Sequence, residues 1–497
     1  MEVEIKLLLD PAALADLNAH PVFAAGGPPT TRRLSSTYFD TPALDLWRGG
    51  ASLRVRKAAS SFVQTFKLDD PSQQLGARGE WEWPVGSDGL DLDLLRTLPP
   101  ELQDRLEAAG RAGPLFTTRI DRQTWQLELE GSTRIEAALD CGTARAGKRQ
   151  AAIAEVELEL KAGPPAPLLR LAIDLVDRYS LRYGSQSKSD RGYALLTDDL
   201  PPRHGADKVE LPDDVSVADA FPLLLNGVLR AFAAEAPLAE RGDVEGVHRM
   251  RAAIRKTRSL LVLFGPELEP HAAERFNANL RELGQALGRG RDWDVLLTET
   301  LAAARKHSVD GVLEPLIREA ELARSDAQQA VAREVGGLGP TRLLLGLAAW
   351  VSEPGWFVGR HPERSLASRL PKMLGRLEHK VRQRSKRIDQ GDPEALHGLR
   401  KSMKKLRYAL EFVRSLYPEK EVESYLRPLK SVLSELGQVN DASVTVSRID
   451  ELAPAERPEL APAAAALLSW NDERRTTSYR KLERKLHRLK DAEPFWD

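Results

Sequence analysis

Charged side chains alternate with apolar ones at the start of the chain, where Glu2, Glu4 and Lys6 are separated by aliphatic residues. A β-strand directs alternate side chains to opposite faces, so these three charges would share one face. Carboxylate oxygens are ligands for Mg²⁺ or Mn²⁺, and lysine and arginine hold phosphate oxygens. Two acids and a base on one face therefore suit either the solvated edge of a sheet or a site for a metal-bound phosphate.

Other short segments carry the same pattern and decide between these two interpretations. Charges repeat on one strand face at Arg54 and Arg56, at Glu80 and Glu82, and at Glu155, Glu157 and Glu159. A solvated sheet face usually mixes its acids with uncharged polar residues. Interior and exterior positions alternate along every strand of a closed barrel, so a barrel built from these strands would have a charged interior. Such an interior suits a metal-bound polyphosphate.

Length, composition and charge narrow the class of protein. The chain has 497 residues, 42% of them hydrophobic and 29% charged, which suits a soluble globular protein of about two to four domains. The single cysteine, Cys141, excludes an intramolecular disulfide and a thiolate zinc cluster. A net charge of −1 gives no bulk signature of nucleic-acid binding. Without an uninterrupted run of about 18 apolar residues or an N-terminal signal region, we expect a cytoplasmic protein with neither a nucleic-acid nor a membrane partner.

Eight short motifs follow one another along residues 1–200. They are Glu2-x-Glu4-x-Lys6, Tyr38-Phe-Asp-Thr41, Leu53-Arg-Val-Arg56, Thr65-x-Lys67, Arg78-x-Glu80-Trp-Glu82, Leu139-Asp140-x-Gly142, Glu155-Val-Glu157-Leu-Glu159 and Ser187-Lys188-Ser189. In type and order they resemble the CYTH domain, the triphosphate tunnel metalloenzyme family. The resemblance implies an eight-stranded antiparallel tunnel that binds a triphosphate together with Mg²⁺ or Mn²⁺.

The resemblance also implies roles for individual residues. The implied metal ligands are Glu2, Glu4, Asp140, Glu155 and Glu157, with Glu159 as a further candidate. The implied phosphate-binding residues are Lys6, Arg54, Arg56, Lys67, Arg119, Arg134 and Lys188, of which Arg119 and Arg134 both lie near the place of the family's tunnel arginine. The residues expected to carry catalysis are Glu2, Glu4, Lys6 and Arg56, while Glu80 and Glu82 match acidic positions of the tunnel.

The pattern changes after residue 200. Residues 201–214 are rich in Pro, Gly and Asp and predict a linker, and residues 215–490 show helical periodicity. His248-Arg-Met-Arg-Ala-Ala-Ile-Arg-Lys-Thr-Arg258 matches His397-Gly-Leu-Arg-Lys-Ser-Met-Lys-Lys-Leu-Arg407, and Leu287-Gly-x-x-Arg-Asp292-x-x-Val295 matches Leu436-Gly-x-x-Asn-Asp441-x-x-Val444. Both matches have an offset of 149 residues without a gap. We therefore predict a duplicated helical unit, with copies at about 219–350 and 365–490.

Each copy carries a stripe of basic residues on one helix. On a helix of 3.6 residues per turn, the members of a stripe fall within an arc of about 80°. The two stripes consist of His248, Arg251, Arg255 and Arg258, and of His397, Arg400, Lys404 and Arg407. A single stripe would usually be a solvated helix face. The recurrence of the stripe in both copies, almost without interleaved acids, favours binding of a multivalent polyanion.

The duplicated stripe and the downstream Leu-Gly-x-x-Arg/Asn-Asp motif resemble the CHAD domain, the conserved histidine α-helical domain, over residues 215–490. The resemblance implies two similar helical bundles around a basic channel that binds inorganic polyphosphate and is lined by the eight stripe residues. The expected fold is therefore α+β and multidomain, with an antiparallel β-tunnel in residues 1–200 followed by an all-α duplicated domain.

A CYTH domain followed by a CHAD domain resembles bacterial inorganic triphosphatases. This resemblance implies a metal-dependent enzyme that hydrolyses tripolyphosphate to pyrophosphate and phosphate, with polyphosphate binding by the helical domain and association with polyphosphate granules in the cytoplasm. Three alternatives to this enzyme stay open: a polyphosphate-binding or targeting protein without turnover, an adenylate cyclase that acts on ATP, and an enzyme for thiamine triphosphate.

Overall fold

The computed structural model describes residues 2–10, 16–17, 19–68, 77–99, 102, 110–197, 209–309, 311–386, 388, 392–454 and 456–496. Contacts divide the chain into two compact units. The first comprises Met1–Lys208, Leu229–Ala234 and Gly337–Pro354, and the second comprises Val209–Val228, Glu235–Gly336 and Gly355–Asp497. Much of the predicted linker, at 201–208, lies outside the described residues.

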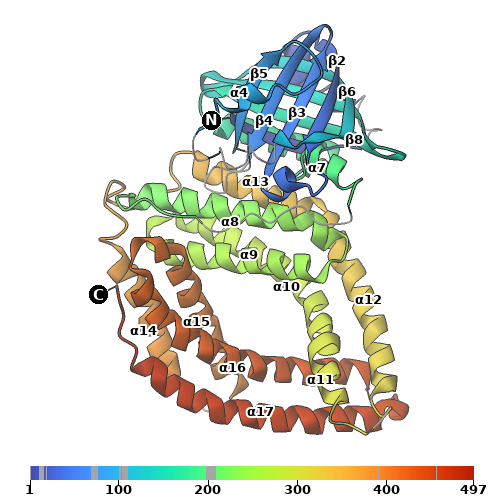
Figure 1. Cartoon of the computed structure of the whole chain (residues 1–497). Helices are drawn as coiled ribbons and strands as arrows, with labels where there is room; N and C mark the ends of the chain where they lie inside the picture. The colour runs from blue at the N-terminus through green and yellow to red at the C-terminus, as the bar shows by residue number, and fades with distance from the viewer. Residues whose placement is uncertain are drawn as a thin grey trace. The chain divides into compact units, whose positions relative to one another are not determined.

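An antiparallel sheet that closes on itself forms the first unit (Figure 1). Its strands are β1 (Glu2–Leu8), β2 (Thr30–Asp40), β3 (Ala51–Ala58), β4 (Ser61–Leu68), β5 (Ala77–Val85), β6 (Gly113–Leu129), β7 (Thr133–Ala146), β8 (Arg149–Ala162) and the two-residue β9 (Arg182–Tyr183). The order is β5-β4-β3-β2-β6-β7-β8-β1-β9, and β1 also pairs with β5 at Glu2 and Val3. Strands β1 to β8 therefore form a closed ring, which confirms the predicted antiparallel tunnel.

The register places the charged residues of the motifs on one common face. Residues opposite one another in an antiparallel pair project from the same face. Across β1, β8, β7 and β6, the pairs are Glu4 with Glu159, Lys6 with Glu157, Asp140 with Glu155 and Arg122 with Asp140. Across β3, β4 and β5, they are Arg54 with Thr65, Thr65 with Glu82 and Lys67 with Glu80. The inner face of the barrel is therefore the charged one.

Much of the hydrophobic core of this unit lies outside the barrel, while a smaller apolar cluster with Leu34, Ile120 and Ile153 lies on the inner face. The alternate residues of β1 and β8, including Ile5 and Leu158, are fully buried, and helix α6 (Ala166–Tyr179) packs on these strands with Leu168 and Leu175. Elsewhere Leu53 and its neighbours pack with residues of the short helices α3 (Asp45–Arg48) and α4 (Leu92–Leu95). The other helices of this unit are α2 (Pro21–Ala25), α7 (Lys188–Tyr193) and α13 (Leu338–Ser352), the last packed on α6.

Helices make up the second unit, as predicted (Figure 1). The first copy contains α8 (Val217–Glu240), α9 (Val244–Leu263), the turn η4 (Gly265–Glu267), α10 (Pro270–Val295), the π-helical η5 (Leu296–Leu301), α11 (Ala302–Arg305) and α12 (Glu314–Gly336). The second contains α14 (Leu370–Lys386), α15 (Pro393–Val413), the turn η6 (Arg414–Leu416), α16 (Glu419–Leu452) and α17 (Ala461–Lys490). At an offset of 149 residues, α9 falls on α15, η4 on η6, α10 together with η5 and α11 on α16, and α12 on α17, to within a few residues. The structural duplication therefore extends well beyond the matching motifs.

One described helix, α8, is long and apolar enough to cross a membrane on length and composition alone. The criterion used for the sequence, an uninterrupted apolar run, did not find this helix. A window of 18 residues can be apolar on average although polar residues interrupt it. Of that window, 61% is buried inside the protein, as in the core helix of a soluble protein.

The short helix α7 packs against β6, β7 and β8. Ser187 and Asp190 form a reciprocal capping box at its start, and the Tyr193 hydroxyl donates to Asp40 at 2.9 Å. The ring of Tyr193 stacks on Trp47 at 5.2 Å. At Gly192 a Cβ atom would lie 1.9 Å from the ring of Phe116, so the helix requires glycine there.

Substitution of Gly192 by alanine tests this packing. Although Gly→Ala within a helix usually stabilises by about 0.5–1 kcal/mol, the contact with Phe116 should make Gly192→Ala destabilising by about 1–3 kcal/mol. The measurement is urea denaturation, with Gly86→Ala as the control because nothing lies within 4 Å of its Cβ position. Equal stability of the two variants would show that α7 is not closely packed.

Candidate functional site

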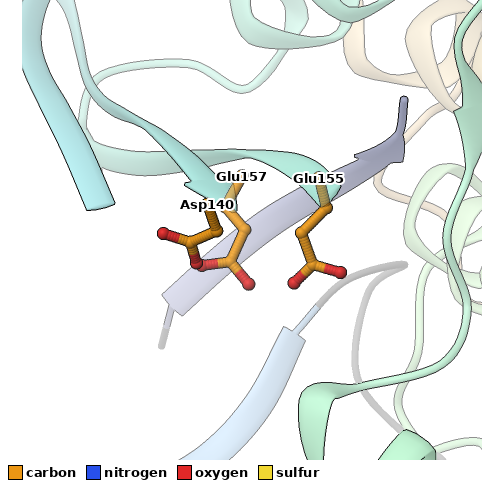
Figure 2. Close-up of side chains that lie close together, drawn as sticks. All are labelled: Asp140, Glu155 and Glu157. Atoms are coloured by element: carbon orange, nitrogen blue, oxygen red, sulfur yellow. The ribbon is translucent and has the colours of Figure 1, made fainter. Parts of the chain in front are cut away.

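Three carboxylates meet on the inner face of the barrel (Figure 2). Asp140 comes from β7, and Glu155 and Glu157 come from β8; one oxygen of each lies within 4.8 Å of the others. The side chains of Asp140 and Glu155 are 0% exposed, and that of Glu157 is 13% exposed. Hard divalent cations prefer oxygen ligands of this kind, so the group is suited to hold Mg²⁺ or Mn²⁺.

Cations surround the three carboxylates. The ammonium group of Lys188 lies 2.5 Å from Glu155 Oε1, 2.6 Å from Glu157 Oε1 and 2.7 Å from Asp140 Oδ2. The guanidinium of Arg122 donates twice to Asp140, at 2.7 and 2.5 Å, and to Glu157 at 2.5 Å. Arg191 donates to Glu155 at 2.8 Å. Helix α7 thus brings Lys188 and Arg191 to the acids of the barrel.

The electrostatics keep Glu157 and Lys188 ionised. Burial by itself raises the pKa of Glu157, but Lys188, Lys6 and Arg122 hold that pKa well below its usual range. Burial lowers the pKa of Lys188, yet Glu157, Glu155 and Asp140 raise it well above its usual range. Glu4 differs: its pKa is raised by burial and by the neighbouring Glu157. The pairing compensates the charges, as buried charges require.

A second group of charges lies on β3, β4 and β5. Lys67 Nζ is 2.7 Å from Glu80, and the Thr65 hydroxyl donates to Glu82 at 3.0 Å. Arg54 is 9% exposed and lies 3.8 Å from Glu80. Among the described atoms, its Nε and Nη2 have no hydrogen-bond partner. Because an unpaired buried donor is costly, this guanidinium fits an anionic oxygen supplied by a ligand.

The structure brings most of the predicted tunnel residues together. Lys6 Nζ lies 3.4 Å from Glu157 and 3.7 Å from Glu4, and Glu159 pairs with Lys161. Arg56 is half-buried on the same inner face as Arg54. The side chain of Glu2 lies outside the described residues, so its predicted role stays a prediction.

Two predicted arginines lie elsewhere. Arg119 is exposed and projects from the face opposite to that of Arg122, and Arg134 is exposed at the start of β7. Arg122, which the sequence analysis missed, takes the place beside the carboxylates. The turn at Gly131-Ser132 could have revealed it, because a hairpin with that turn sets Arg122 opposite Asp140.

A separate cluster of cations lies between α9 and α15, which pack on one another. Arg255 Nε lies 3.4 Å from the Tyr408 hydroxyl, so the two basic faces meet. The Nε atoms of Arg400 and Arg407 are buried, and no described atom accepts a hydrogen bond from them. Burial first, and then neighbouring arginines, lower the pKa of Arg251 to about 10. In contrast to the barrel, cations here lie close together.

The remaining stripe residues lie around this cluster. Arg258 donates to Asn277 at 2.9 Å. His248 is half-buried and His397 is exposed, and partial burial followed by nearby cations lowers the pKa of both imidazoles. His397 Nδ1 lies 3.2 Å from Asn440 Oδ1. Neutral imidazoles at pH 7 can donate a hydrogen bond to phosphate without adding charge.

Comparison with known proteins matches each unit to a family. Residues 1–193 match the family model of the CYTH domain, and residues 224–450 match that of the CHAD domain. An inorganic triphosphatase of Haemophilus influenzae is 29% identical over 196 residues, which are 39% of this chain and 54% of that protein. The alignment thus spans about half the length of that relative.

Two further similarities cover the helical part. An uncharacterised protein of Mycobacterium tuberculosis is 28% identical over 418 residues, with 76% of this chain and 75% of that protein covered. The crystal structure of the CHAD domain from the plant Ricinus communis has 27% sequence identity and a TM-score of 0.50, over 57% of this chain and 96% of that one. These matches confirm both family resemblances.

Removal of the Lys188 ammonium tests the charge compensation. Without metal, Lys188→Met would leave three buried carboxylates short of a cation and should lower the free energy of unfolding by about 3–5 kcal/mol. Urea denaturation in EDTA measures this. Lys161→Met is the control, because its ion pair with Glu159 is partly exposed, with 42% and 20% of the two side chains accessible, and is worth about 1 kcal/mol. Equal losses in both variants would contradict a compensating role for Lys188.

Proposed function

Since the chain carries a CYTH domain followed by a CHAD domain, we propose that it is a metal-dependent inorganic triphosphatase. The reaction is hydrolysis of tripolyphosphate to pyrophosphate and phosphate inside the barrel. One observation carries the proposal: the inner face combines a buried three-carboxylate group with at least five basic side chains. Similarity to an inorganic triphosphatase supports the same chemistry.

In this proposal, Asp140, Glu155 and Glu157 hold the metal, with Glu4 beside them. The bound Mg²⁺ or Mn²⁺ would supply Lewis acidity toward the phosphoryl group and lower the pKa of a water. Lysine and arginine of the inner face bind and orient the three phosphates and neutralise charge that develops during transfer. These residues are Lys6, Arg54, Arg56, Lys67, Arg122 and Lys188.

The identity of the triphosphate is the part of this proposal that a substrate panel decides. We expect tripolyphosphate to be preferred over ATP and thiamine triphosphate, because the proposed contacts are all to phosphate oxygens. Faster turnover of ATP with release of cyclic AMP would identify an adenylate cyclase instead. Binding of polyphosphate without hydrolysis of any triphosphate would identify a binding or targeting protein.

Two arginines three residues apart on β6 give a sharp test of the site. Arg122→Ala should lower kcat for phosphate release from tripolyphosphate by about 100-fold, because Arg122 orders two carboxylates and contributes positive charge. Arg119→Ala, on the exposed face, should stay within about twofold of the wild type. Glu4→Gln and Arg56→Ala should also lose activity. Circular dichroism controls for folding, and equal activity of all four variants would remove the barrel from the mechanism.

We further propose that the helical domain binds inorganic polyphosphate through the cluster between α9 and α15. Buried cations without a full set of counter-ions cost free energy, and a flexible polyanion repays that cost at many phosphates at once. The Nε atom of Arg400 has no hydrogen-bond acceptor among the described atoms and is a donor for such a ligand. Arg407 Nε also lacks a hydrogen bond, although Glu411 lies 3.7 Å away. Polyphosphate carries no bases, so the site needs no aromatic stacking platform.

Loss of one arginine from each copy tests this site. Arg251→Ala combined with Arg400→Ala should weaken binding of long-chain polyphosphate by about 100-fold, because each charge-assisted hydrogen bond contributes about 1.5–3 kcal/mol. The salt dependence of the dissociation constant should become shallower at the same time. Fluorescence anisotropy of labelled polyphosphate measures both. Arg305→Ala with Arg414→Ala is the control, since both arginines are exposed and paired with acids. An unchanged affinity in the first variant would place the polyphosphate site elsewhere.

A further inference from the structure

Lys404 occupies an exceptional place in the cluster between α9 and α15. At the offset of 149 residues its counterpart in the first copy is Arg255, so the duplicated stripe holds an arginine in one copy and a lysine in the other. On the continuous helix α15, Lys404 lies one turn from Arg400, from Arg407 and from Tyr408, and Arg255 of the packed helix α9 contacts the Tyr408 hydroxyl at 3.4 Å. The groups that act most strongly on its charge are accordingly all arginines: Arg400, Arg255, Arg407 and Arg251. Lysine releases a proton when it is crowded by cations, whereas arginine stays charged.

The elements packed on α15 bring other charged groups near, but these are largely committed to other partners. From α9, Arg255 lies 3.4 Å from the Tyr408 hydroxyl. From α14, Arg384 donates to Gly398 O and Ser402 Oγ, and Lys380 adds positive charge beside Lys405. From α16, Asp441 acts on Arg400, and on α15 itself Glu411 lies 3.7 Å from Arg407. The site around Lys404 is therefore strongly cationic.

Burial, followed by the four arginines, lowers the pKa of Lys404 to about 6. At neutral pH its amine is then mostly uncharged, which relieves repulsion in the ligand-free protein. A polyanion in the same place would reverse both effects, because it supplies the missing negative charge and the hydrogen-bond acceptors that the cluster lacks.

We propose that the helical domain binds polyphosphate together with a proton that is taken up by Lys404, so that the affinity of this site falls as pH rises. The inference rests on the proposed polyphosphate binding and names the residue that regulates it. The counterpart of Lys404 in the first copy is Arg255, an arginine that stays charged. Only Lys404 therefore takes up a proton, and one proton is expected per bound site.

The sign of the pH dependence follows from the two states. The amine of the free protein loses its proton above about pH 6, and in the complex the ammonium persists to higher pH. Between these limits each pH unit costs up to about tenfold in affinity. The wild type should thus bind close to tenfold more weakly at pH 8 than at pH 7.

Isothermal titration calorimetry of the full chain with long-chain inorganic polyphosphate tests the proposal. Titrations in EDTA at pH 8, in Tris and in HEPES, give the number of protons taken up from the difference in buffer ionisation heat. We expect an uptake approaching one proton in the wild type. Lys404→Arg should bind without this uptake and with an affinity nearly independent of pH. Lys404→Met should bind more weakly, also without uptake, and should keep the stability of the free protein because its side chain is neutral.

Histidines are excluded as the source by a further variant. His248→Gln with His397→Gln should retain the uptake at pH 8, where both imidazoles are neutral in the free protein. Equal proton uptake in the wild type and in Lys404→Arg, or none in the wild type despite binding, would overturn the inference while leaving polyphosphate binding intact. Absence of wild-type binding would instead overturn the proposed polyphosphate function and this inference with it.

Discussion

Pairing of charges inside the barrel is the constraint on which the rest of this structure depends. Closure of the sheet removes Asp140 and Glu155 from water completely, and buried carboxylates persist in ionised form only beside cations. Arg122 and Lys188 provide these cations. Because ion pairs occupy much of the interior, most hydrophobic residues of the strands pack outward, against α6 and the short helices. The fold is thus a barrel with most of its apolar core on the outside.

The same constraint explains the elaborate attachment of a helix only six residues long. Lys188 is useful only if α7 holds it at the carboxylates, and the lysine side chain alone is too flexible for that. A capping box, the hydrogen bond from Tyr193 to Asp40 and the contact of Gly192 with Phe116 all hold the helix in place. Apolar packing and hydrogen bonds therefore position a charge that no packing could stabilise by itself.

Sequence patterns predicted the features that depend on residues close together in the chain, and missed those that depend on contacts between distant segments. Strand alternation assigned Lys6 and Arg54 to one face because the period of two is local. It left Arg119 and Arg122 undistinguished, since that choice depends on the register across the β6–β7 hairpin. The offset of 149 residues predicted the duplication. It did not predict that α13 packs on α6, because the sequence of an apolar helix does not specify which apolar surface it packs against. The contact of Arg255 with Tyr408 was hidden likewise, since it joins helices of different copies.

The two proposed anion sites would solve one physical problem in opposite ways. In the barrel, acids neutralise the bases, so a phosphate chain gains little unless a divalent cation takes over the carboxylates and leaves lysine and arginine to the phosphates. Between α9 and α15, cations meet cations, and a bare polyanion suffices. Metal concentration should therefore control the first site, and pH and salt the second. One ligand class can serve both because a polyphosphate has metal-binding oxygens and a high density of negative charge.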